Sequence, residues 1–209
     1  MIHTKNLVFK GFLSYPELEI KKHQTSFIIG ESGVGKSAFL RMINGSESSP
    51  DNSLFIQGTD INELDPIEVR KDYLLCGQSV FLFPGTISDN FAMFYSLRNI
   101  PTPSDEIIQK FLDLVCLPIA ADSKIDTMSG GEKQRVYLAI FISLARHCIL
   151  LDEPTSALDK ATAERLLTNL KAYCQKASLS AIIISHDDSL ATEFADAILD
   201  LNKIERGNF

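Results

Sequence analysis

One eight-residue segment limits the choice of fold more than any other part of the chain: Gly30-Glu31-Ser32-Gly33-Val34-Gly35-Lys36-Ser37. It matches the pattern G-x-x-x-x-G-K-[ST] and stands between an apolar run, Ser26–Ile29, and a stretch with helical periodicity, Lys36–Ile43. Glycines allow such a loop to turn its backbone N–H groups toward one anion, and the following helix adds the positive end of its dipole. The segment therefore predicts a phosphate-binding loop behind a strand of an α/β sheet.

The residues of this loop have separate roles. Lys36 would place a positive charge on the outer phosphates, and Ser37 would offer its hydroxyl to Mg²⁺. A glycine-rich turn without a ligand is the alternative, and the flanking strand and helix argue against it. We predict that a nucleotide is held by Gly30, Glu31, Ser32, Gly33, Val34, Gly35, Lys36, Ser37 and Ala38.

Strand-like and helix-like segments alternate along most of the chain. Two apolar runs, Ile149–Leu151 and Ile182–Ile184, do not alternate with polar residues, which is typical of strands buried on both faces of a parallel sheet. Between about residues 86 and 145 only helical patterns remain. We predict one α/β domain, 1–209, with a core at about 1–85 and 146–209 and a helical subdomain at about 86–145. The expected strands are Ser26–Ile29, Leu54–Ile56, Tyr73–Cys76, Cys148–Leu151, Ala181–Ser185 and Ile198–Leu201. The expected helices are Lys36–Ile43, Asp105–Cys116, Gly131–Ala145, Lys160–Gln175 and Ser189–Ala195.

Charge and hydropathy exclude several classes of protein. The chain carries 20 Lys and Arg against 27 Asp and Glu, a net charge of −7 without a run of like charges, so nucleic acid is not expected as a partner. The longest apolar run, Val136–Ala145, is about half the ~20 residues that cross a bilayer. No secretory signal is recognisable, so we expect a cytoplasmic location.

Two adjacent carboxylates follow the apolar run Cys148–Leu151. Ligands of parallel sheets bind where the strands end, and Asp152 and Glu153 stand at such an end. On extended chain the two side chains would point in different directions and could take different roles. We expect Asp152 to hold Mg²⁺ beside Ser37, and Glu153 to accept a proton from the water that attacks the γ-phosphate. Two acids that merely cap a strand before Pro154 are the alternative.

A third motif, Ser129-Gly130-Gly131-Glu132-Lys133-Gln134-Arg135, resembles the signature of ATP-binding cassette (ABC) ATPases when it is taken together with the first two. Ser129 and Glu132 have the spacing of a capping box, and the two glycines leave the start of the helix open to an anion. A simple helix cap is the alternative. The order of the other motifs also resembles this family, over essentially the whole chain.

The resemblance implies a fold and further site residues. The fold would be a P-loop NTPase core with a mainly parallel sheet, an antiparallel β portion at the N-terminus and an inserted helical subdomain. Gln78 stands where the family has its Q-loop glutamine, a magnesium ligand, and Ser156–Asp159 resembles the D-loop, whose Asp159 would lie at the nucleotide. His186 would be the switch histidine, which contacts the γ-phosphate and orients Glu153. Ser129, Gly130 and Gly131 would face the nucleotide of a second copy in a head-to-tail dimer.

Four features depart from the family pattern. Met128 stands where leucine is usual, and Ala38 where a second hydroxyl is usual. The aromatic side chain that stacks on adenine in the family has three competing positions, Phe9, Phe12 and Tyr15, each of which could equally be core. We favour Phe12. His23 stands where a turn glycine is common.

Within the family, the size of the chain favours the ATPase subunit of a transporter, which would need ATP, Mg²⁺ and a separate transmembrane permease that holds it at the membrane. Phe81 and Phe83 would receive the permease, or else lie buried between subdomains. The stretches Leu75–Asn90 and Phe111–Pro118 are loosely similar to the ATPase subunit of a two-component bacterial iron exporter. A nucleotide-gated regulatory module without turnover is the alternative from another class, and a soluble kinase or GTPase would leave Ser129–Arg135 unexplained.

Overall fold

A parallel sheet of five strands forms the centre of the molecule. The computed structural model describes residues 1–11, 13–203 and 205–206. The strands lie in the order β11 (Ala197–Asp200), β5 (Thr25–Ile29), β10 (Ser180–Ile184), β9 (Cys148–Asp152) and β8 (Tyr73–Cys76). Because every pair is parallel, the carboxyl ends of all five strands meet at one edge of the sheet. The expected strands lie within one or two residues of these bounds, and the predicted fold class is confirmed.

The two faces of this sheet pack into two separate cores. Phe27, Leu151 and Ile183 belong to one apolar cluster, and their neighbours Ile28, Leu150 and Ile182 belong to the other. This alternation follows from the period of two residues in a strand. Helices α5 (Gly130–Leu144) and α6 (Lys160–Ala177) cover the first face, and α1 (Lys36–Ile43) covers the second. Because both faces of β9 and β10 are buried, these two strands need runs without polar residues.

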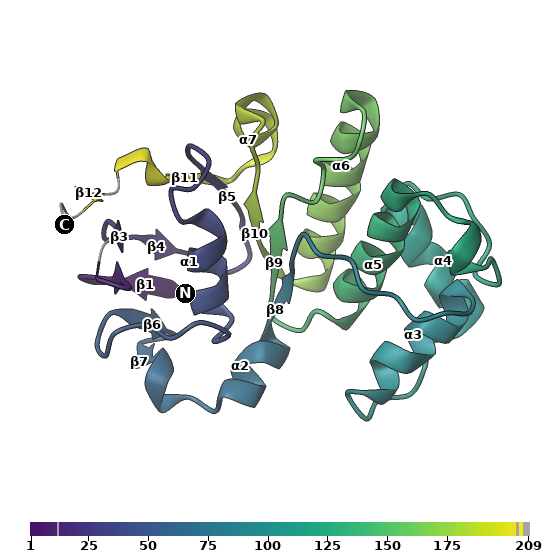
Figure 1. Cartoon of the computed structure of the whole chain (residues 1–209), viewed down its shortest axis with the longest axis horizontal. Helices are drawn as coiled ribbons and strands as arrows, with labels where there is room; N and C mark the ends of the chain where they lie inside the picture. Colours follow the sequence, from purple (N-terminus) through teal and green to yellow (C-terminus); the bar gives the residue numbers. More distant parts are fainter. Residues whose placement is uncertain (12, 204, 207–209) are drawn as a thin grey trace.

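An antiparallel portion built largely from the N-terminal residues lies on the α1 side of the molecule (Figure 1). One sheet has the order β4 (Glu19–Ile20), β1 (Ile2–Thr4), β6 (Leu54–Ile56) and β7 (Thr59–Asp60). A small second sheet joins β12 (Glu205–Arg206) to β3 (Leu13–Ser14) and β2 (Val8–Phe9), so the last described residues return to the start of the chain. The predicted antiparallel portion is thereby confirmed.

Helices dominate the segment between residues 86 and 145. Helices α3 (Ile87–Ser96), α4 (Asp105–Leu114) and α5 contact one another, and they lie together at the side of the molecule away from the antiparallel strands (Figure 1). Helix α5 also contacts β8, and its apolar side chains share the core of the central sheet. The division into a core and a helical subdomain stays a prediction. No helix among the described residues combines the length and the hydropathy of a membrane span.

Helices α2 (Pro66–Asp72) and α3 are not among the helices expected from the sequence. Helix α2 leads into β8, and α7 (Asp188–Phe194), expected at Ser189–Ala195, leads into β11. Three short 3₁₀ turns occur at Ile61–Glu63, Ile125–Thr127 and Leu201–Lys203. Asp65 caps α2 by accepting from the backbone N–H of Ile67, and Pro66 occupies its first position. These two residues are therefore a local signal for α2.

Candidate active site

The predicted phosphate loop joins β5 to α1 at the carboxyl edge of the sheet. Its three glycines have positive φ values, 149° at Gly30, 76° at Gly33 and 103° at Gly35, so the loop uses conformations that other residues rarely adopt. The Lys36 side chain turns back over the loop, where its Nζ donates to the carbonyl oxygens of Gly30 at 2.7 Å and Glu31 at 2.9 Å. The loop's own carbonyl groups thus bind the ammonium.

Helix α1 begins without a side-chain cap. Gly35 is its N-cap, no side chain among the described residues caps the first turn, and that turn has no acidic residue. Helices α3, α5, α6 and α7 differ, because Thr86, Ser129, Asp159 and Asp187 cap them. The uncapped N–H groups and the dipole of α1 thus remain available to an anion.

Burial lowers the pKa of the Lys36 ammonium, and the nearby charges of Glu153 and Asp152 oppose this effect. Lys36 is only 5% exposed, yet it lies within electrostatic reach of both carboxylates that follow β9. The structure therefore brings together the first two motifs, which are more than a hundred residues apart in the chain.

Asp152 and Ser37 have the chemistry of a magnesium site. Burial and the charge of Glu153 raise the pKa of Asp152, whereas a hydrogen bond from Ser37 lowers it. The Oδ1 atom of Asp152 is buried and has no hydrogen-bond partner among the described residues. A buried carboxylate oxygen without a donor is costly, and carboxylate and hydroxyl oxygens are ligands that Mg²⁺ prefers. These residues therefore fit the expected ion.

Glu153 differs from the expectation in its backbone. We expected extended chain, but Glu153 has φ 55°, in the left-handed region. Its N–H still donates to Ile184 O of β10 at 3.2 Å, and its carbonyl accepts from Ser156 N at 3.3 Å and Ser156 Oγ at 3.0 Å. The chain thus leaves the sheet in a tight turn directly after Asp152. The prediction that Asp152 and Glu153 lie on extended chain was wrong for Glu153.

His186 lies beside Glu153 at the same edge. It follows β10, and its Nε2 is 2.7 Å from Oε1 of Glu153, with the two side chains 48% and 20% exposed. A cavity of about 370 Å³ opens here and is lined by both residues and by Ser156 and Ser185. The orienting role that the family resemblance implied for His186 stays a prediction, and it requires a direct contact of this kind.

The remaining candidates lie around this edge with more exposure. Gln78 is exposed two residues beyond β8, whose Cys76 pairs with Leu151 of β9, so the register places it beside the strand of Asp152. Ser129 forms the predicted capping box with Glu132 at the start of α5, and Ser129 and Gly130 are exposed. Asp159 accepts from Thr162 N at 3.0 Å as the cap of α6, and this bonding lowers the pKa of Asp159.

The surroundings of the aromatic candidates show which of them could present a ring to adenine. Tyr15 is 3% exposed and its hydroxyl donates to Gly35 O at 2.9 Å, so it supports the loop and does not present a ring to a ligand. Phe9 is buried, with the ammonium of Lys10 4.8 Å from its ring centre. Phe12, our choice for adenine stacking, lies outside the described residues. The contact of Tyr15 with the loop has no local signal in the sequence.

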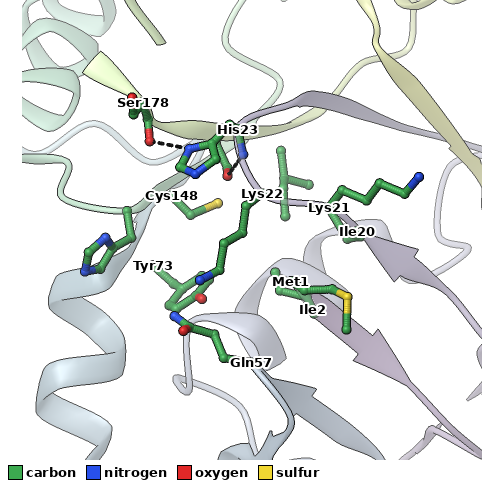
Figure 2. A pocket seen from close by; sticks show the side chains of 13 residues that line it. Met1, Ile2, Ile20, Lys21, Lys22, His23, Gln57, Tyr73, Cys148 and Ser178 are labelled. Atoms are coloured by element: carbon green, nitrogen blue, oxygen red, sulfur yellow. Dashed lines mark hydrogen bonds between the residues drawn. The ribbon is translucent and has the colours of Figure 1, made fainter. Parts of the chain in front are cut away.

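A larger cavity than the one beside His186 lies at the other end of the strands. It measures about 410 Å³, and its lining includes Lys22, His23, Tyr73, Cys148 and Ser178, near the amino ends of β5, β8, β9 and β10 (Figure 2). Tyr73 and Cys148 begin β8 and β9, so the length of the strands separates this cavity from Asp152 and His186. His23 has φ 58°, in keeping with a position where glycine is common. A choice of site by cavity volume alone would thus have selected the wrong end of the strands.

The combination of a parallel sheet, a phosphate loop and a carboxylate pair at its carboxyl edge defines a P-loop nucleotide-binding protein. The family model described as "ABC transporter" matches residues 13–156. The chain therefore belongs to the ABC transporter family.

Individual relatives agree with this assignment. The glutamine transport ATP-binding protein GlnQ of Bacillus subtilis is 34% identical over 191 residues, covering 89% of this chain and 78% of the relative. The sulfate/thiosulfate import ATP-binding protein CysA 2 of Chromobacterium violaceum is 31% identical over 191 residues, covering 91% of this chain but only 52% of the relative. The chain thus spans about half the length of some curated relatives that it matches.

A solved structure of the same fold spans the whole chain. The ATP-binding cassette MJ0796, described as a dimer in a post-hydrolysis state with ADP and Pi bound, superposes with a TM-score of 0.80 at 26% identity and 100% coverage of both chains. The likeness therefore includes the antiparallel portion and the helical segment as well as the central sheet.

Proposed function

We propose that this chain is the ATP-binding and ATP-hydrolysing subunit of an ABC transporter. The observation that carries the proposal is the meeting of Lys36, Asp152, Glu153 and His186 at one sheet edge, within electrostatic or hydrogen-bond reach of one another. These groups supply, in that order, a positive charge for phosphates, a magnesium ligand, a base and a group that orients the base.

The phosphate loop binds the nucleotide in this proposal. Lys36 would exchange the carbonyl groups of Gly30 and Glu31 for the outer phosphates, and the uncapped N–H groups of α1 would bind the same phosphates. Ser37, Asp152 and Gln78 would hold Mg²⁺, which neutralises charge on the phosphates when it is bound. Phe12 is our candidate for stacking on adenine.

Glu153 accepts the proton of the attacking water. Its carboxylate contacts His186 Nε2 at 2.7 Å, so the imidazole fixes one carboxylate oxygen and leaves the other for the water. A regulatory module without turnover would not need this pair. The pair therefore supports hydrolysis over a purely regulatory role.

A second copy completes each site. Ser129 and Gly130 are exposed at the start of α5, and Gly131 approaches Ala157 of the Ser156–Asp159 segment, since a Cβ on Gly131 would lie 3.9 Å from Ala157 O. The exposed start of α5 thus lies beside the segment that contains Asp159. A second nucleotide-bound copy would meet this combined surface head to tail. The dimer described for MJ0796 supports this arrangement.

A separate transmembrane permease would hold the chain at the cytoplasmic face of the membrane. Phe81 is 60% exposed and Leu97 is 69% exposed, and a hollow of about 310 Å³ between α2, α3 and α5 is lined by Ile67, Leu97 and Phe141. Phe83 is half-buried and packs edge-on against Phe81 and Phe94, at 5.0 and 5.8 Å between ring centres. We assign the permease contact to Phe81 and this hollow. Export of iron is our prediction for the cargo, from the sequence resemblance alone.

Replacement of the loop lysine tests the proposal. Lys36→Ala removes the charge that faces the phosphates, so we expect ATP binding by calorimetry to weaken by at least about 100-fold. Lys176→Ala, at an exposed position near the end of α6, is the control and should bind ATP as the wild type does. Unchanged affinity in Lys36→Ala would contradict the assignment of the loop, and a preference for GTP over ATP would favour the GTPase alternative.

A further inference from the structure

Two side chains from outside the phosphate loop approach the backbone at its first and last glycines. A Cβ on Gly35 would lie 2.6 Å from the Tyr15 hydroxyl oxygen, closer than real contacts allow. A Cβ on Gly30 would lie 3.0 Å from Cγ1 of Val34 in the loop itself and in ordinary contact, at 3.4 Å, with Oδ1 of Asn202. The missing side chain at Gly35 therefore admits Tyr15 to the loop backbone, and Asn202 lies against the backbone at Gly30.

Tyr15 is firmly held beneath the loop. It follows β3, its backbone N–H donates to Leu7 O at 2.8 Å, and its ring stacks on Phe39 of α1 with centroids 5.3 Å apart. The hydroxyl donates to Gly35 O at 2.9 Å. Burial raises the pKa of Tyr15 to about 12, so the hydroxyl keeps its proton at neutral pH.

The bond to Gly35 sets the direction of the next amide. A trans peptide is planar, so its C=O and N–H groups point in opposite directions. Because Gly35 O faces Tyr15, and also accepts the first helical bond from Phe39 N at 2.9 Å, the N–H of Lys36 must point the other way. Tyr15 thereby helps to keep this amide on the side of the loop away from its own ring.

Asn202 acts in the same way on the peptide between Gly30 and Glu31. The N–H of Glu31 donates to Asn202 Oδ1 at 2.8 Å, and the carbonyl of Gly30 accepts from Lys36 Nζ at 2.7 Å. When Lys36 moves to a phosphate, only the carbonyl side of this peptide is released. Asn202 would still hold the N–H side.

The segment that carries Asn202 is itself anchored. Leu201 is fully buried, and the N–H of Asn202 donates to Asp200 Oδ1 at 2.9 Å. Strand β12 then pairs with β3, directly before Tyr15. The two side chains therefore come from one structural unit, in which the last described residues pack beside the start of the chain.

We propose that Tyr15 and Asn202 are positioning residues that hold the phosphate loop in its nucleotide-receptive shape before nucleotide binds. The inference rests on the proposed function of the loop and deepens it. A loop that already has its bound shape loses less conformational freedom on binding, so the two residues increase nucleotide affinity without contacting the reacting atoms.

The test removes each bond and leaves the fold in place. Tyr15→Phe loses only the hydroxyl, and Asn202→Ala loses the acceptor. Tyr95→Phe is a matched control, because the Tyr95 hydroxyl also donates to a backbone carbonyl, Ser143 O at 3.3 Å. Asn169→Ala likewise removes an amide that bonds to remote groups, Leu114 O at 3.0 Å and Cys116 Sγ at 3.7 Å.

We expect each of the two loop variants to bind ATP about five-fold more weakly in calorimetry, the usual effect of one hydrogen bond. The KM for ATP should rise similarly, while kcat at saturating ATP stays within about two-fold of wild type, since the reacting groups are unchanged. The double variant should lose about 25-fold, because the residues act on different peptides. Both control variants should keep the wild-type affinity.

Amide exchange supplies a second readout that does not depend on catalysis. In the free protein, the Glu31 amide should exchange faster with solvent in Asn202→Ala, while Asn202→Asp, which keeps an acceptor oxygen, should retain slow exchange. Affinities equal to those of the controls, or a fall in kcat at unchanged KM, would overturn the role of Tyr15 and Asn202. A wild-type protein that does not bind ATP would instead overturn the proposed function.

Discussion

At the scale of single residues, the backbone conformation of Glu153 explains why its carboxylate points toward His186. A non-glycine residue in the left-handed region costs on the order of 1 kcal/mol, and Ile184 and Ser156 hold Glu153 there by hydrogen bonds. Extended chain would have continued β9 beyond Asp152. The turn instead places the Glu153 carboxylate 2.7 Å from His186, at the end of the neighbouring strand.

Loss of the imidazole should affect turnover and not binding. In His186→Ala, Glu153 would lose the group that we propose orients it, and we expect the ATPase rate to fall by about 100-fold while the Kd for ATP changes less than about three-fold. His147→Ala is the control, since His147 is exposed at the opposite edge of the sheet, 3.8 Å from Asp72. Equal rates in the two variants would contradict the orienting role.

Site residues that belong to a local sequence motif could be predicted. Residues that reach the site from distant positions in the chain could not. Lys36, Ser37 and Asp152 follow from motifs within a few residues of a strand end. Tyr15 and Asn202 contact the loop from positions 20 and 171 residues away in the chain, and no periodicity or spacing links them to it. The left-handed turn at Glu153 likewise depends on its bond to β10.

At the scale of elements, helices α1 and α5 differ in how the N–H groups of their first turns are bound. Helix α5 is closed by the capping box of Ser129 and Glu132, in which the Glu132 carboxylate accepts from Ser129 N at 2.8 Å and Ser129 Oγ at 2.7 Å. Helix α1 has no such cap. The proposed signature segment is therefore ordered within one subunit. The first N–H groups of α1, in contrast, stay available to a ligand of the phosphate loop.

This capping box predicts a pH dependence. Hydrogen bonds from Ser129 lower the pKa of Glu132 below its ordinary value of 4.5, so the folded state favours the carboxylate. The stabilising contribution is therefore present above pH 4.5 and declines as pH falls below it. In urea unfolding, wild type should be more stable than Glu132→Gln at neutral pH, and the difference should shrink below that value. A difference that grows on acidification would contradict this account.

The long strands of the central sheet were predictable from the sequence, and the short N-terminal strands were not. Strands β5, β9 and β10 have five residues each and are buried on both faces, and each contains an apolar run that is visible in the sequence. Several N-terminal strands have only two residues, such as β2 and β4, which is too short to display a period. Their pairing depends on distant partners, and only the family resemblance indicated an antiparallel portion.

At the scale of the whole molecule, the two cores position all proposed catalytic groups on one edge. Helix α1 packs in one core and α5 in the other, so the phosphate loop and the start of α5 belong to opposite faces of the same sheet. Ser129 and Gly130 are exposed there. The exposure of these two signature residues is the structural basis for our proposal that two copies share two nucleotides.

The most direct test of the central claim measures ATP binding, dimerisation and phosphate release in the same preparation of Glu153→Gln and wild type. The amide keeps the size of the side chain but cannot accept the proton of water. We expect Glu153→Gln to bind Mg·ATP with wild-type affinity, to sediment as a dimer in its presence, and to release phosphate at least about 100-fold more slowly than wild type. Phosphate release at the wild-type rate would contradict the assignment of Glu153 as the base, and with it the proposed mechanism.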